Sequence, residues 1–176
     1  FMGWPENRRS LEHLFKDLDE MYKKSTNVSP LPFKYIMKVS VTFLKEMDID
    51  IQGITKNEQR NLLHYAAKVD NQFLDYLLPK FENIDTLDRD GCTPLHLACE
   101  SGNLVNAKTL LAHGADVNKP TKNGDTSLMI LAKRKSLDPK FFKLLLKHNA
   151  ACDLYNKNDM RAVDIVRKRN KTSTII

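Results

Sequence analysis

Two cysteines and a histidine lie close together in the middle of the chain, in the pattern Cys92-x3-His96-x2-Cys99. Thiolates and imidazole are the ligands that zinc prefers, and a structural zinc site needs a fourth ligand that this spacing does not supply. A thiol beside an imidazole is also the pattern of a nucleophile with its base, but catalysis needs an orienting third group and a cleft. We therefore expect free thiols, with no catalytic residue, metal or cofactor.

Positive charge is concentrated in the last third of the chain. Residues 1–118 contain 14 Lys and Arg against 17 Asp and Glu, whereas residues 119–176 contain 14 against 5. The runs Lys133-Arg134-Lys135 and Arg167-Lys168-Arg169 favour an acidic peptide or loop of another protein as partner. A solvated basic face is the alternative. Nucleic acid is disfavoured, because no aromatic residues that could stack on bases are interleaved with these cations.

Several other classes of protein are disfavoured by what the sequence lacks. It contains no glycine-rich phosphate loop, no H-E-x-x-H zinc-protease motif and no consistent pair of carboxylates. We therefore expect that the chain is not an enzyme. It contains no run of roughly 18–20 apolar residues, and its first residues lack the apolar core of a signal peptide. With an odd number of cysteines, three, the sequence favours the cytoplasm, with the nucleus as an alternative.

The elements that would position these side chains are short helices. Thr93 can cap a helix that begins at Pro94, where a missing N–H costs nothing, and Gly102 can end it. A second helix follows and stops at Gly114, which can take the left-handed conformation that a helix end needs. Its predicted buried stripe consists of Leu104, Val105, Ala107, Leu110 and Leu111.

The stretch Thr93-Pro94-Leu95-His96-Leu97-Ala98 resembles the T-P-L-H-x-A signature of the ankyrin repeat, whose period is about 33 residues. Gly91 and Gly124 are 33 residues apart. A third copy begins at Gly124, with Met129 in the place of His96. Residues 136–139 lengthen its turn before a helix predicted over 141–147. A degenerate first copy contains residues 61–67, and an incomplete fourth contains residues 158–166. The resemblance implies an all-α solenoid of about four copies.

The ends of a solenoid need to be covered, because each repeat buries its core against its neighbours. Two amphipathic helices precede the repeats, and we interpret them as an N-terminal helical cap. Leu31-Pro32 before the second of them faintly resembles an F-box, which would give that segment a separate binding role. The predicted organisation is a disordered or expression-derived start at 1–9, the cap at 10–49, ankyrin repeats at 50–170 and a tail at 171–176.

Ankyrin repeats bind other proteins through their turn tips and the exposed side of each first helix, so the resemblance implies a monomeric protein-binding module. An alternative is the scaffold or targeting portion of a larger, enzymatic polypeptide, such as a bacterial effector that acts in the host cytosol. The predicted partner-binding residues are Arg89, Asp90, Glu100, Ser101, Lys122, Asn123, Asp125, Lys133, Arg134, Lys157, Asn158, Met160, Lys168 and Arg169.

Asn118 belongs to a second pattern that the family suggests. Leu110, Asp116, Val117 and Asn118 match the Leu-x5-Asp-Val-Asn sequence that asparaginyl hydroxylases modify in many ankyrin proteins. Asn118 is therefore a candidate hydroxylation site by resemblance. Its structural role, which is compatible with modification, is to hold the turn between repeats.

Overall fold

The structure is a computed structural model that describes residues 60–69, 74–75 and 77–173. The predicted cap at residues 10–49 and the start of the predicted repeats lie outside the described residues. The cap and its boundary with the repeats therefore stay predictions.

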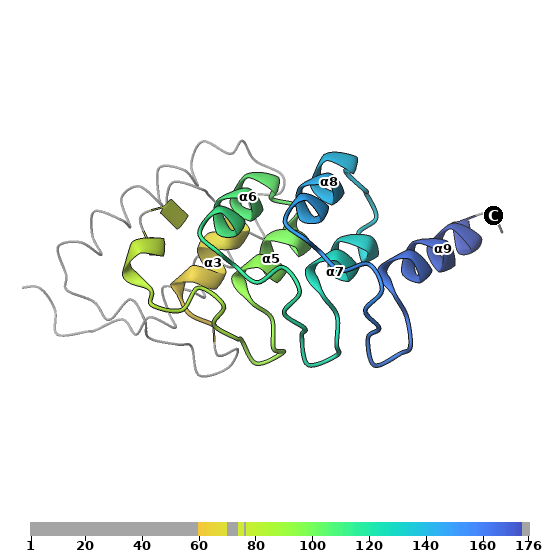
Figure 1. Ribbon diagram of the computed structural model, residues 1–176, viewed down its shortest axis with the longest axis horizontal. Coiled ribbons are helices and arrows are strands. Elements are labelled where there is room, and N and C mark those ends of the chain that lie inside the picture. The colour runs from red at the N-terminus through yellow and green to blue at the C-terminus, as the bar shows by residue number, and fades with distance from the viewer. Residues whose placement is uncertain (1–59, 70–73, 76, 174–176) are drawn as a thin grey trace, which may run out of the picture.

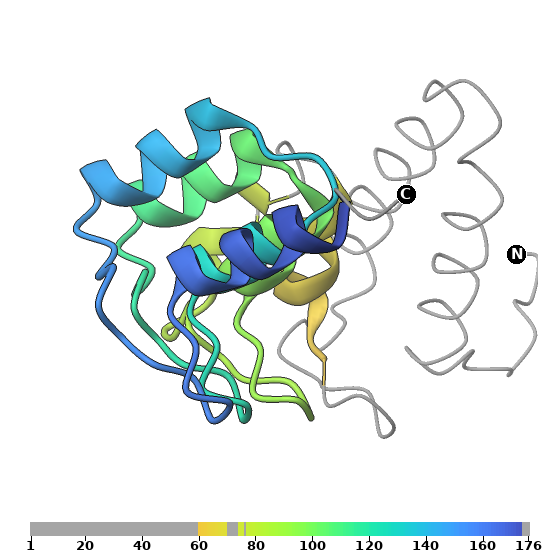
Figure 2. The same cartoon turned by 90° about the vertical axis from the view of Figure 1, so that its right-hand side faces the viewer.

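The described part of the chain is all-α and contains no strand. Four first helices follow one another along the long axis of the molecule, with second helices in a layer above them and loops on the opposite side (Figures 1 and 2). The solenoid predicted from the sequence is confirmed. The first helices are α3 (Leu62–Val69), α5 (Pro94–Ser101), α7 (Ser127–Lys133) and α9 (Ala162–Ser173), and the others are η1 (Leu78–Lys80), α6 (Leu104–Ala112) and α8 (Pro139–Lys147).

The start of α5 shows why the signature sequence forms a helix at this place. The Thr93 hydroxyl accepts a hydrogen bond from the His96 backbone N–H at 3.3 Å, and His96 Nδ1 accepts one from the Thr93 N–H at 2.9 Å. This reciprocal pair satisfies two amides that the helix leaves unpaired. At the other end, Gly102 has a φ of 77°, so the predicted helix start and stop are both confirmed.

Helix α8 begins two residues earlier than the sequence indicated. The predicted turn at residues 136–139 included Pro139, but the Asp138 carboxylate accepts a hydrogen bond from the Lys140 N–H at 2.9 Å and caps the helix. Pro139 is then its first residue, where proline's fixed φ fits and its missing N–H costs nothing. Helix α9 also continues to Ser173, beyond the predicted end of the repeats at residue 170.

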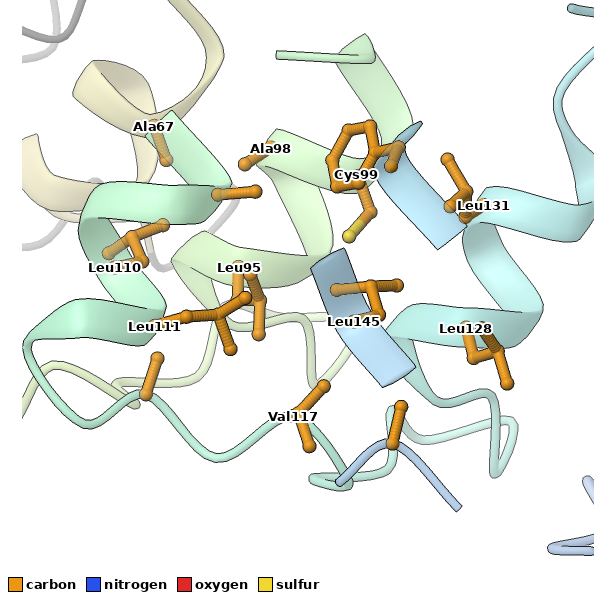
Figure 3. Packing of buried hydrophobic residues seen from close by; sticks show 14 of the residues in the cluster. Ala67, Leu95, Ala98, Cys99, Leu110, Leu111, Val117, Leu128, Leu131 and Leu145 are labelled. Atoms are coloured by element: carbon orange, nitrogen blue, oxygen red, sulfur yellow. The ribbon is translucent and has the colours of Figure 1, made fainter. Parts of the chain in front are cut away.

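The core is continuous from repeat to repeat, because α5 packs against α3, α6 and α7. Figure 3 shows Leu95, Leu110, Leu128 and Leu145 from four different helices among its side chains. Burial of each such side chain contributes roughly 1.5–3 kcal/mol to stability. Neighbouring repeats therefore stabilise one another.

Helix α6 buries Ala107, Leu110 and Leu111 of its predicted stripe and half-buries Leu104, but it does not bury Val105. Val105 is 54% exposed, and the adjacent Asn106 is fully buried in its place. The Asn106 side-chain amide donates hydrogen bonds of 2.9 Å to the carbonyl oxygens of Ala66 and Ala67, near the end of α3. Asn106 thereby ties the second repeat to the end of the first helix of the first repeat.

Helix α7 lacks the cap of its neighbours. Met129 occupies the position of His96 and offers no nitrogen to the start of the helix, and the Thr126 side chain makes no capping hydrogen bond. The buried hydroxyls of Thr126 and Ser127 have no hydrogen-bond partner within the described residues. In the fourth repeat, a carboxylate takes the place of the histidine as acceptor. Asp164 accepts a hydrogen bond from the Arg161 N–H at 3.1 Å. The start of α7 is the weakest helix start of the four.

We expect Met129→His to raise the free energy of unfolding by about 0.5–1.5 kcal/mol, because its imidazole would restore the reciprocal cap. Urea denaturation followed by circular dichroism measures the change. Met160→His is the control, since residue 160 precedes the helix and cannot form this cap. A loss of stability in Met129→His would show that the burial of the second ring nitrogen outweighs the cap.

Candidate partner-binding groove

A pocket of about 410 Å³ lies between the loops and first helices of the second and third repeats. It brings together six of the predicted partner-binding residues, from segments more than 30 positions apart in the sequence. The residues that line it are Asp90, Cys92, His96, Leu97, Glu100, Thr121, Asn123, Asp125, Ile130, Lys133 and Arg134.

Each loop is held in shape by one side chain at its base. The Asp88 carboxylate accepts hydrogen bonds from the N–H groups of Asp90 and Cys92 at 2.9 and 2.8 Å. Asn156, at the equivalent position of the last loop, accepts from the N–H groups of Asn158 and Met160 at 3.0 and 3.1 Å. Asp88 and Asn156 are both buried, so the loop tips above them are rigidly placed.

Backbone hydrogen bonds then link the tips of neighbouring loops. The Lys122 N–H donates to the Asp90 carbonyl at 3.0 Å, and the Lys157 N–H donates to the Asn123 carbonyl at 3.0 Å. Arg89, Lys122 and Lys157 stand at the same position of successive loops, and all three are exposed. We call these three residues the tip row. It presents one positive charge per repeat in a fixed register.

The prediction that Asp125 is exposed for a partner was wrong, since this residue is 5% exposed. Its carboxylate accepts a hydrogen bond from the Asn156 side-chain amide at 2.8 Å and forms an ion pair with Lys133. Asp125 therefore connects the third and fourth repeats, and the Lys133 charge is largely compensated.

Arg134 and Arg169 also serve the packing between repeats. Arg134 Nη1 donates to the carbonyl of Glu100 in the preceding repeat, and Arg169 Nη1 donates to the carbonyl of Arg134. Gly102 makes room for this contact, since a Cβ atom there would collide with the Arg134 guanidinium. These two arginines, predicted as a binding surface, each hydrogen-bond to the end of the neighbouring first helix.

The contacts of Lys133 and Arg134 hold neighbouring repeats together. From these contacts we expect Lys133→Glu with Arg134→Glu to lower the free energy of unfolding by about 2 kcal/mol, because Asp125 would face a second carboxylate. Chemical denaturation measures the loss. Lys108→Glu with Lys143→Glu, both exposed on the second helices, is the control. Equal stability of the two double variants would show that the contacts of Lys133 and Arg134 contribute nothing measurable.

The cysteine and histidine cluster is part of the fold. Cys99 is fully buried, and Nδ1 of His96 is occupied by the helix cap. Burial raises the pKa of both Cys92 and Cys99 to about 12, and burial lowers the pKa of His96 to about 4. At neutral pH both thiols are protonated and His96 is neutral. The described residues contain no group of three or more His, Cys, Asp or Glu arranged to hold a metal ion.

Asn118 joins the loop after α6, in the second repeat, to the loop after α8, in the third. Its side-chain amide donates to the Asn149 carbonyl at 3.0 Å, and its oxygen accepts from the Ala151 N–H at 2.8 Å. One repeat earlier, the Asp85 carboxylate accepts from the Asp116 N–H at 3.0 Å. The expected structural role of Asn118 is therefore present. Its hydroxylation stays a prediction.

The other predicted residues lie around the pocket or beyond it. Ser101 is half-buried at the end of α5, while Lys157 and Asn158 are exposed in the last loop. Met160 and Arg169 are half-buried, and Lys168 is exposed on α9. Leu97, Thr121 and Ile130 also line the pocket, although they were not among the predicted partner-binding residues. Leu97 and Ile130 occupy the same repeat position, so the period of 33 residues was the signal that could have found them.

Comparison with known proteins agrees with this architecture. Residues 36–121 match the profile of the family described as "Ankyrin repeats (3 copies)". The chain belongs to the ankyrin-repeat family. The match begins within the segment predicted as cap, whereas the described ankyrin repeats continue past residue 121 through α7, α8 and α9.

Curated relatives carry similar ankyrin repeats within longer proteins. The chain is 32% identical over 122 residues to the Ankyrin repeat and LEM domain-containing protein 1 homolog of Caenorhabditis elegans, which covers 67% of this chain and 16% of that protein. It is 32% identical over 125 residues to Delta-latroinsectotoxin-Lt1a of Latrodectus tredecimguttatus, covering 68% of this chain and 10% of the toxin. The Probable 26S proteasome regulatory subunit p28 of Saccharomyces cerevisiae is 32% identical over 101 residues, covering 54% and 43%.

The chain thus spans less than half the length of each of these relatives. Ankyrin repeats are in general protein-interaction modules, and that level of function holds for this chain. Among the described helices, none is both long enough and apolar enough to cross a membrane.

Proposed function

We propose that this chain is a non-catalytic, monomeric module that binds a partner protein along the loop tips and the groove beside them. The proposal rests on one observation, the backbone pairing of successive loops, which holds the cations of the tip row in register. A preformed surface loses little conformational entropy when it binds. The ordered row favours a partner that is itself extended.

An acidic segment of the partner fits the tip row by charge. Within the described residues, the side chains of Arg89, Lys122 and Lys157 have no ion pair, unlike Lys133. Three uncompensated positive charges at equivalent positions attract carboxylates and speed association. The acidic partner predicted from the sequence is therefore retained, but its contacts move from Lys133 and Arg134 to the tip row. We place this binding in the cytoplasm or nucleus.

Selection from a random peptide display library tests the proposal without a known partner. We expect the full chain to enrich acidic peptides, and Arg89→Glu with Lys122→Glu and Lys157→Glu to lose them. The control Lys108→Glu with Lys143→Glu changes charge on the second helices and should enrich the same peptides as the unchanged chain. Equal loss in the control would place the interface elsewhere. If the full chain bound RNA and no peptide, and the triple variant of the tip row lost the RNA, the row would be a nucleic-acid site.

A further inference from the structure

The charges around the pocket of the second and third repeats differ in whether they are already paired. Both of its cations are engaged, since Lys133 pairs with the buried Asp125 and Arg134 donates to the Glu100 carbonyl. These two positive charges are therefore only partly available to a bound ligand.

The carboxylates of Asp90 and Glu100 are less engaged than these two cations. Asp90 is exposed, and its side chain has no ion pair or hydrogen bond among the described residues. Glu100 has one contact, with Lys68 at 3.5 Å, and its side chain is 61% exposed. The charge that the pocket can offer to a ligand is therefore negative, although the tip row beside it is positive.

Two further properties describe the kind of group that the pocket can accept. Its volume of about 410 Å³ lies within the roughly 300–1,000 Å³ of pockets that bury small ligands, so a long side chain fits. Its wall includes the half-buried side chain of Ile130 and the half-buried thiol of Cys92. The Cys92 thiol stays protonated, because burial raises its pKa and the carboxylates of Asp88, Glu100 and Asp90 raise it further. An aliphatic stem that ends in a positive charge matches such a surface.

We propose that this pocket receives a lysine or arginine side chain of the partner, as a cationic anchor within the acidic segment that lies over the tip row. The inference rests on the proposed function and makes it more specific, because it requires a partner segment that carries both signs of charge. An acidic segment alone would bring its carboxylates against Asp90 and Glu100. The pocket thus discriminates among acidic partners by favouring those with a basic residue at the matching place.

The peptides selected on the full chain provide the test. We expect them to share one lysine or arginine among acidic residues. Replacement of that residue by norleucine, which keeps the aliphatic stem, should weaken binding about tenfold in fluorescence anisotropy. Asp90→Asn with Glu100→Gln should weaken the parent peptide about as much and the norleucine peptide hardly at all. Glu82→Gln changes an exposed carboxylate outside the pocket and should leave both affinities unchanged.

The possible failures are distinguishable. Acidic peptides without a shared basic residue, or equal binding of the norleucine peptide, would overturn the anchor and leave the proposed function intact. Equal weakening of parent and norleucine peptides by Asp90→Asn with Glu100→Gln would also overturn it. If no peptide is enriched by the full chain, both the anchor and the proposed function fail.

Discussion

Replacement of Asn106 by leucine is expected to lower the free energy of unfolding by about 2–4 kcal/mol. Leucine has nearly the shape of asparagine but cannot donate to the carbonyl oxygens of Ala66 and Ala67, which Asn106 reaches at 2.9 Å. Those two carbonyls would lose these hydrogen bonds in the core, and the loss of a buried hydrogen-bond partner costs about 1–3 kcal/mol. Chemical denaturation at neutral pH measures the difference.

Asn123→Leu is the matched control, because this asparagine is exposed at a loop tip. It should change stability by less than about 0.5 kcal/mol. If Asn106→Leu were as stable as the unchanged chain, the amide of Asn106 would not be what joins the first two repeats.

Stability is also expected to fall by about 2–3 kcal/mol between about pH 7 and about pH 4.5 through His96. Burial lowers the pKa of His96 from 6.5 to about 4, so the folded chain keeps this imidazole neutral where the unfolded chain protonates it. Because unfolding takes up a proton at this imidazole, acid favours the unfolded chain and the free energy of unfolding falls with the pH. The contribution of His96 is complete above about pH 6.5 and is lost as the pH falls towards 4. Burial also lowers the pKa of His64, which acts in the same direction.

His96→Gln isolates this contribution, because glutamine at the same position can still accept a hydrogen bond from the Thr93 N–H but does not titrate. Denaturation of both proteins at the two pH values gives the comparison. The variant should lose about 2–3 kcal/mol less than the unchanged chain on acidification. Parallel losses would assign the acid sensitivity to other groups, such as the carboxylates.

The fold could be predicted because its signals are local. Thr93, Pro94 and Gly102 specify the start and the end of α5 through contacts within a few residues, and the period of 33 residues repeats them. The start of α8 was missed because the inserted residues resembled a longer turn. Nothing in the spacing showed that Asp138 would cap the helix one residue before Pro139.

The candidate site could be predicted only as a set of residues on one face. Their individual roles depend on contacts between repeats, such as that of Arg134 with a carbonyl 34 residues earlier. Asp125 was expected to be exposed because the resemblance to ankyrin repeats places it in a turn tip, but the Asn156 amide, 31 residues later, holds it in a buried network. A sequence pattern assigns a residue to a face, whereas the partner that a side chain finds there depends on the neighbouring repeat.

The backbone pairing of the loop tips has a consequence for how the array opens. Each pairing contributes one amide proton, that of Lys122 between the second and third repeats and that of Lys157 between the third and fourth. In a solenoid, neighbouring repeats can separate without unfolding of the whole array. The hydrogen-exchange rates of these two amides therefore measure the opening of two adjacent interfaces independently, and a bound partner that spans all three tips must slow both.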